Sequence, residues 1–290
     1  MANETTSGTL DDLLPSIVQE AMFVASERSI MRGLVRNYSL APGQGKVVTV
    51  PIYPKQTAAV LTEGDEISNT AVSTSAGTIT ISPKAIRTLV TDLAVSQSAS
   101  NVVADLGRLF GEAVARKMDA DLGALLAGFS TSVSFTNDYT TNIAAANIFE
   151  AVAKLRAQGI SMDGISCVLH PEIAYTLKKV LTTGGTTAFT AGGGTSEVAN
   201  EAMRMGYIGQ LAGVPIYESA NIAYVTNAGD FPGGVFHRDA LGLALVGDIT
   251  IETQRRASYL GTDVVASCHY GVAELYDAYG VSLKFDSELS

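Results

Sequence analysis

Three stretches of the chain carry apolar side chains at helical spacing. In residues 9–36 they recur every three or four positions, which lines one face of a helix. The clearest pattern covers residues 101–127 and stops at Gly128, and a shorter one covers 147–158. At 1.5 Å per residue the middle helix would be about 40 Å long. The pattern therefore predicts an amphipathic N-terminal arm and a long helix that serves as the spine of a domain.

Between Lys46 and Asp92 the apolar period changes to two. Residues 48, 50 and 52 are apolar and alternate with polar residues or proline, and 78–81 repeat the alternation after a polar tip at 63–76. This predicts a long two-stranded hairpin. Such a hairpin has too few large apolar side chains to be stable alone in water, so we expect it to lie against something outside its own domain.

The second half of the chain mixes short helices and strands. A buried strand is expected at 165–169, a helix beginning at His170–Pro171, a turn and strand at 209–217, and further strands within 234–284. A Gly- and Thr-rich loop fills 183–196. Because the regular strand–helix alternation of a parallel sheet is absent, the predicted class is α+β.

The composition of the chain indicates which classes of partner it can bind. The 290 residues include 47% hydrophobic and only 17% charged residues, with 19 basic against 29 acidic side chains, a net charge of −10. Such a chain is globular, and a weakly charged surface suits burial in an assembly. The acidic balance argues against tight binding of phosphate backbones, so DNA would be contacted only non-specifically. With no long apolar run and no signal-peptide features near Met1, neither a membrane partner nor export is expected.

Charges in the predicted arm separate by sign. The charges from Glu4 to Glu27 are acidic, whereas Arg28, Arg32 and Arg36 recur at intervals of four and would share one helical face. This face could bind acidic surfaces on a neighbour or scaffold, or could be a solvated helix end.

Catalytic and metal-binding motifs are not found. Gly45–Lys46 lacks the rest of a phosphate-binding loop, and the three histidines lack metal-ligand spacing. Asp119 and Asp121 are two apart and face different sides of the predicted helix. Cys167 and Cys268 lie in apolar runs and are expected to be buried free thiols. We therefore expect no enzyme activity, no cofactor and no metal.

Six short motifs occur in a characteristic order along these elements. They are Ala59-Val-Leu-Thr-Glu-Gly64, Ile79-Thr-Ile-Ser-Pro-Lys84, the helix 101–127, Leu169-His-Pro-Glu172, Gly209-Gln-Leu-Ala-Gly-Val-Pro-Ile-Tyr217, and Arg256-Ala-Ser-Tyr259 leading into Asp263-Val-Val265. In this order the chain resembles the tailed-bacteriophage major capsid proteins with the Hong Kong 97-like fold.

The resemblance implies an α+β capsid fold with four parts. These are an N-terminal arm at 1–46, a β-hairpin E-loop at 47–92, a peripheral domain with the spine helix at 93–133 and 249–270, and an axial domain at 134–248 and 271–290. It implies a structural protein of the virion, assembled in the host cytoplasm, whose pentamers and hexamers form an icosahedral head around double-stranded DNA.

The resemblance also implies partners and interface residues. The partners are other copies of the chain, a portal protein, a cement protein where one is used, and a separate scaffolding protein, because a scaffolding segment does not fit before residue 47. Candidates for inter-subunit contacts are Arg28, Arg32, Arg36, Lys55, Glu63, Asp65 and Glu66. Where the family cross-links its subunits it uses a loop lysine, and Lys55 is the candidate on the outgoing strand.

Two alternative functions remain open from sequence. One is an encapsulin-like nanocompartment shell, which shares this fold. The other is a hydrolase with Cys268 or a serine as its nucleophile, for which His269 is the neighbouring candidate base.

Overall fold

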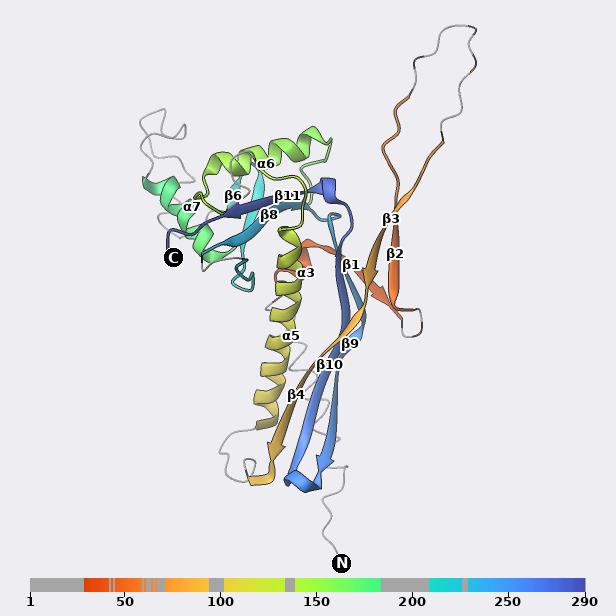
Figure 1. The fold of residues 1–290 in the computed structure, drawn as a ribbon, viewed down its shortest axis with the longest axis vertical. Helices are drawn as coiled ribbons and strands as arrows, with labels where there is room; N and C mark the ends of the chain where they lie inside the picture. The colour runs from red at the N-terminus through yellow and green to blue at the C-terminus, as the bar shows by residue number, and fades with distance from the viewer. Residues whose placement is uncertain are drawn as a thin grey trace, which may run out of the picture.

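A computed structural model of the chain describes residues 29–41, 43, 45–58, 60, 64, 66, 71–93, 102–133, 139–183, 209–225 and 229–289. It has three visible parts (Figure 1): a compact five-stranded sheet with two helices, an elongated unit in which one long helix runs beside a four-stranded sheet, and a hairpin that projects from the body. The expected α+β class is observed.

The elongated unit is built on the spine helix, α5. Its bounds, Val102–Leu126, agree with the prediction from sequence. The four-stranded sheet beside it, here called the elongated sheet, has the order β1-β9-β10-β4, with β1 Arg36–Leu40, β4 Ser82–Thr91, β9 Leu241–Arg256 and β10 Gly261–Glu274. Phe110, Leu122 and Leu126 of α5 are buried with Ala266 and Tyr270 of β10 in one core.

The compact part is a sheet of five strands in the order β11-β8-β5-β7-β6. The strands are β5 Ile165–Leu169, β6 Gln210–Leu211, β7 Val214–Glu218, β8 Phe231–His237 and β11 Gly280–Phe285. Helices α6, Ala145–Ala157, and α7, Pro171–Thr183, pack against it. All five residues of β5 are buried, as expected of a central strand.

The hairpin is shorter than its alternating pattern predicted. β2, Val47–Ile52, pairs with β3, Ser75–Thr80, in a separate two-stranded sheet. The alternation continues past Ile81, but there the chain leaves the hairpin, and β4 pairs with β10 instead. The prediction that the hairpin extends to residue 92 is therefore wrong, because a period of two identifies a strand and not its partner.

The predicted helix over residues 9–36 also needs correction where the structure describes it. Helix α3 covers only Met31–Leu34, and Arg36 already begins strand β1, which pairs in parallel with β9. The edge of the elongated sheet supplies backbone partners that outweigh the helical preference of this segment. Residues 9–28 lie outside the described residues.

The elongated and five-stranded sheets meet at the end of β10. From there η3, Asp277–Tyr279, leads directly into β11, while the segment after α5 lies alongside: the amide and hydroxyl of Ser282 both bond to the carbonyl of Thr131. Strand β9 runs unbroken through residue 248, so the expected domain boundary there falls within one strand.

Candidate assembly surfaces

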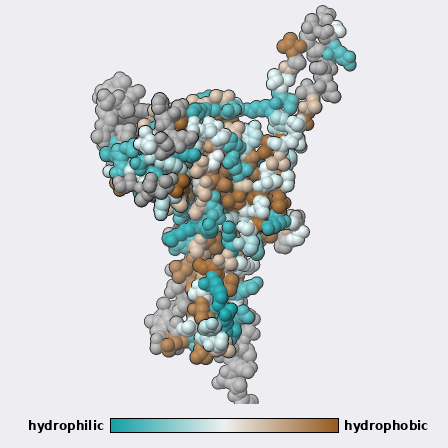
Figure 2. Space-filling model, viewed as in Figure 1, coloured by the Kyte–Doolittle hydropathy of each residue, from teal (hydrophilic) through white to brown (hydrophobic). Residues whose placement is uncertain are grey.

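The outer limbs of the hairpin are the most exposed part of the described chain. Tyr53 is 69% exposed, Val60 99% and Val72 55%. Figure 2 shows apolar and polar groups mixed along this projection, well away from the rest of the molecule. Apolar side chains held this far from their own core are costly to leave in water, and a second protein surface would cover them.

The base of the hairpin, in contrast, is part of the chain's own core. Ile79 is fully buried and packs with Ala244 and Leu275. Two glycines permit this close approach: a Cβ on Gly271 of β10 would overlap the carbonyl oxygen of Thr80. A Cβ on Gly242 would lie 2.8 Å from the side chain of Ile79. The hairpin is thus anchored at its base by apolar packing.

Lys55, on the outgoing limb, has an acceptor within its own chain. Its ammonium group donates to the carbonyl of Gln158, the residue that caps the C-terminus of α6. A cation at a helix C-terminus is favourable because the last carbonyls lack helical partners. This contact links the hairpin to the five-stranded part.

The far end of the elongated sheet forms a second exposed apolar surface. Leu93, Tyr259 and Leu260 are 64%, 59% and 69% exposed, and Leu260 has φ of 46°. We call these three residues the distal tip. The tip is held in shape by Asp92, whose carboxylate accepts two bonds from Arg255, at 2.5 and 2.7 Å, and whose amide donates to Leu260. The Arg255 guanidinium lowers the pKa of Asp92.

Just behind the distal tip, a buried carboxylate is held by two arginines. Asp263 is 2% exposed and lies 2.5 Å from Nε of Arg256 and 2.9 Å from Arg87. Arg256 and Asp263 belong to one of the motifs noted in the sequence, and the structure gives them a shared role: they tie β9 to β10 beside the tip.

Carboxyl groups also meet where the two sheets join. Asp277 accepts a bond from the amide of Ser130, at 2.8 Å, and another from its hydroxyl. These bonds lower the pKa of Asp277 against the effect of burial. Burial, together with the hydrogen bond and charge of Asp277, raises the pKa of Glu274 to about 7. The junction therefore contains a titratable group near neutral pH.

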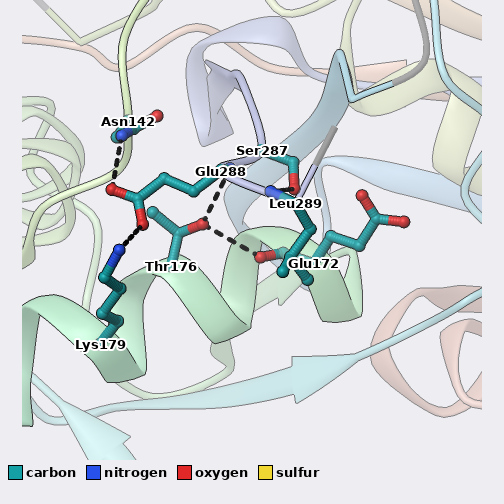
Figure 3. Close-up of polar contacts among 7 residues, drawn as sticks. All are labelled: Asn142, Glu172, Thr176, Lys179, Ser287, Glu288 and Leu289. Carbon is teal, nitrogen blue, oxygen red and sulfur yellow. Dashed lines mark hydrogen bonds and ion pairs between the residues drawn. The ribbon is translucent and has the colours of Figure 1, made fainter.

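The C-terminal residues are fastened to α7 (Figure 3). The Glu288 carboxylate accepts bonds from Asn142, at 2.9 Å, and Lys179, at 2.5 Å, and the Glu288 amide donates to Thr176. The ion pair raises the pKa of Lys179. Glu288 is thus held against the compact part of the molecule.

A family model of phage capsid proteins matches residues 73–282 of the chain. The chain belongs to the phage capsid protein family. A comparison with curated proteins gave no match.

Solved structures agree with this assignment at the level of the fold. A structure from Mycobacterium phage Che8 has a TM-score of 0.66 and 22% identity over 82% of this chain and 84% of that one. The capsid of Cyanophage P-SCSP1u has a TM-score of 0.66 and 19% identity over 90% and 89% of the two chains. The capsid of a native GTA particle has a TM-score of 0.66 and 16% identity over 90% and 91%. The Hong Kong 97-like fold expected from sequence is therefore confirmed.

The structure locates four of the seven interface candidates of this capsid protein. Arg32 and Glu66 are exposed, Lys55 contacts Gln158, and Arg36 pairs with Asp239 at 2.7 Å. That pair raises the pKa of Arg36. Arg28, Glu63 and Asp65 lie outside the described residues. Because Arg36 is on a strand, Arg32 and Arg36 do not form the continuous helical face that their spacing predicted.

Residues considered for catalysis are separated in the capsid protein. Cys268 is 1% exposed, whereas its neighbour His269 is exposed on the other face of β10, so the two do not form a nucleophile–base pair. Both cysteines are free and buried as predicted, and burial raises the pKa of the Cys167 thiol to about 12. In the part of the chain that the structure describes, no cluster of metal-ligating side chains is found.

Sequence reasoning missed the distal tip, Asp263 and the Glu274–Asp277 pair. The motif Arg256–Tyr259 pointed to this region, but neither the exposure of Tyr259 nor the pairing with Asp263 follows from spacing alone.

None of the described helices has the length and apolar content that a bilayer span requires.

Proposed function

We propose that this capsid protein assembles into pentamers and hexamers of an icosahedral phage head that encloses double-stranded DNA. The observation that carries the proposal is the hairpin: it is fixed at its base by Ile79 and exposed beyond Ile52, with Val60 almost fully accessible. A rigid base with an uncovered extension is suited to lie across a neighbouring subunit.

In this proposal the parts of the fold take the roles expected from sequence, except that β1, β4 and the start of β9, expected in the arm, the E-loop and the axial domain, join the peripheral domain. The hairpin is the E-loop, α5 with the elongated sheet forms the peripheral domain, and the five-stranded sheet with α6 and α7 forms the axial domain around the capsomer centre. The distal tip is the contact between subunits at the far end of the peripheral domain, because its three apolar side chains need a cover.

The charge distribution is compatible with a DNA-filled shell. The net charge of −10 disfavours tight adhesion to the packaged nucleic acid. On the spine helix, Arg116 and Lys117 are paired with Glu112 and Asp121 one turn away, which weakens the cationic field of this exposed face. The family match favours a virion shell over an encapsulin-like compartment, and the burial of Cys268 disfavours the hydrolase alternative.

Scaffolding, portal and cement proteins are proposed as partners, with assembly in the host cytoplasm. Arg32 and Glu66 are the described candidates left for inter-subunit or scaffold contacts, because Arg36 and Lys55 have acceptors within the chain.

The experiment is an assembly assay on the purified full-length chain, alone and with the scaffolding protein supplied. Sedimentation and negative-stain imaging should reveal capsomer rings or closed shells. A stable monomer under every condition, scaffold included, would contradict the proposal.

A further inference from the structure

Asp119, in the middle of α5, is a completely buried carboxylate with four hydrogen-bond donors. Its side chain accepts bonds from the Ser29 hydroxyl at 3.1 Å, from the amides of Ile30 and Met31 at 3.3 Å each, and from the Asn221 side chain at 3.2 Å. It is 0% exposed.

These donors come from two segments far apart in the sequence. Three belong to residues 29–31, where the described chain begins, and the fourth belongs to the loop after β7. The same loop is packed against α5: a Cβ on Gly123 would lie 3.1 Å from the side chain of Ile222. One carboxylate therefore joins the spine helix, the start of the described chain and the compact part of the molecule.

An apolar contact accompanies this polar one. Met31 and Val35 are fully buried and pack in the same core as Phe110 and Met118 of α5. Apolar burial holds the segment against the helix but tolerates sliding and rotation, whereas bonds to two consecutive amides fix one register. Ile30 and Met31 stand at the N-terminal end of α3, where helix amides lack acceptors within the helix, and Asp119 accepts from both.

Burial of the Asp119 carboxylate in its ionised form is unfavourable for folding. Burial is the largest influence on its pKa and raises it, although all four hydrogen bonds act in the opposite direction. A raised pKa means that the folded state binds the proton more tightly than the unfolded chain, so ionisation of Asp119 reduces folding stability as pH rises. A side chain of similar size without charge would avoid this cost, which points to a role in placement.

We infer that Asp119 is a positioning residue for assembly: it fixes Ser29–Met31 between α5 and the loop containing Asn221, and thereby sets the direction in which the N-terminal residues leave the body. The inference rests on the proposed function, because this direction matters for shells only if the chain builds them. Because Asp119 bonds to both, a displacement of the loop after β7 would also displace residues 29–31, and the reverse.

The test compares Asp119→Asn and Asn221→Ala with Glu112→Gln in the full-length chain. Glu112→Gln is the matched control, since it makes the same carboxylate-to-amide change on α5 at a surface ion pair with Arg116. Hydrogen exchange is followed at Ile30 and Met31, and shell yield is measured well below each thermal midpoint. Loss of bonds to a charged acceptor predicts exchange about tenfold faster or more in Asp119→Asn. We expect a smaller acceleration in Asn221→Ala and none in the control.

The expected assembly result is a reduced shell yield for Asp119→Asn at temperatures where it is fully folded, which a purely structural role would not give. Unchanged exchange at Ile30 and Met31 would overturn the inference, as would accelerated exchange with wild-type shell yield. If Asp119→Asn does not fold, the inference is tested on Asn221→Ala, by hydrogen exchange at Ile30 and Met31 and by shell yield. A wild-type chain that builds no shells contradicts the proposed function instead, while the exchange data still decide whether the anchor exists.

Discussion

The carboxyl groups of Glu274 and Asp277 interact at the end of β10: burial, together with the hydrogen bonding and charge of Asp277, raises the pKa of Glu274 to about 7. The two bonds that Ser130 donates stabilise the ionised form of Asp277, so Glu274 is the member of the pair that holds a proton near neutral pH. The pair lies where the elongated and five-stranded sheets join, so its protonation acts on the connection between them.

This pair predicts a stability that falls as pH rises. The pKa of Glu274 is about 7 in the folded chain, against 4.5 for an unperturbed glutamate side chain. The folding stability gained from protonated Glu274 is therefore fully present below about pH 4.5 and is lost as pH rises through about 7. Glu274→Gln should flatten this dependence and make the protein more stable than wild type at pH 8 by about 1–2 kcal/mol, allowing for solvent screening.

Chemical denaturation from pH 5 to 8.5 checks this prediction. Asp277→Asn serves as a comparison, because it removes the charge that acts on Glu274 and also weakens the bonds from Ser130. Parallel stability curves for wild type and Glu274→Gln across this range would show that the pair does not titrate as described.

Asp263 is predicted to be essential for the stability of the distal end of the elongated sheet. Asp263→Ala leaves Arg87 and Arg256 without their shared carboxylate, and removal of one partner from a buried ion pair costs about 3–5 kcal/mol. Because both arginines are partly exposed, the lower end of this range is expected. Urea denaturation of Asp263→Ala should show it, with Asp92→Ala as the control.

Asp92 is a suitable control because it forms the neighbouring carboxylate–arginine pair at the surface, with Arg255. Its loss should have a far smaller effect, since water replaces an exposed partner. Equal destabilisation by the two substitutions would mean that burial of Asp263 is not what gives its ion pairs their importance.

Gly271 is predicted to be intolerant of any side chain. The Cβ of Gly271→Ala would overlap the carbonyl oxygen of Thr80, and backbone cannot move aside as a flexible side chain can. We expect a loss of about 1–3 kcal/mol and faster hydrogen exchange in β3. Gly33→Ala, where no atom lies within 4 Å of the new Cβ, should cost nothing. Similar stability of the two variants would contradict the close packing of the hairpin base.

The long helix and the class of the fold could be predicted because they depend on local periodicity. Val102–Leu126 keeps one apolar face over seven turns, and Pro171 begins α7 where a proline is tolerated. The partners of the strands could not be predicted in the same way. Ser82–Thr91 continues the alternation of β3, and only the three-dimensional position of β10 decides that it leaves the hairpin.

The candidate surfaces could be predicted only in part, because they too depend on which segments pair in three dimensions. The hairpin was recognised as an unsupported element, but the contact between Lys55 and Gln158 joins positions more than a hundred residues apart. The spacing of Arg32 and Arg36 predicted a helical face, and pairing of β1 with β9 replaced the helix with a strand. Contacts that depend on tertiary pairing leave no periodic signal in one sequence.

The outer hairpin is predicted to serve assembly and not folding. Replacing residues 54–73 by a short turn removes the exposed limbs and keeps β2, β3 and the buried Ile79. The thermal midpoint should stay within a few degrees of wild type, while shells are lost or become unstable. A shortened chain that no longer unfolds cooperatively would show that the limbs belong to its own core.

A cryo-EM reconstruction of the assembled wild-type protein tests most directly whether the hairpin is covered by a neighbouring subunit. We predict closed shells of pentamers and hexamers in which Tyr53, Val60 and Val72 of each hairpin are covered by a neighbouring subunit. Shells in which these side chains remain in solvent, or particles with no closed symmetry, would contradict it.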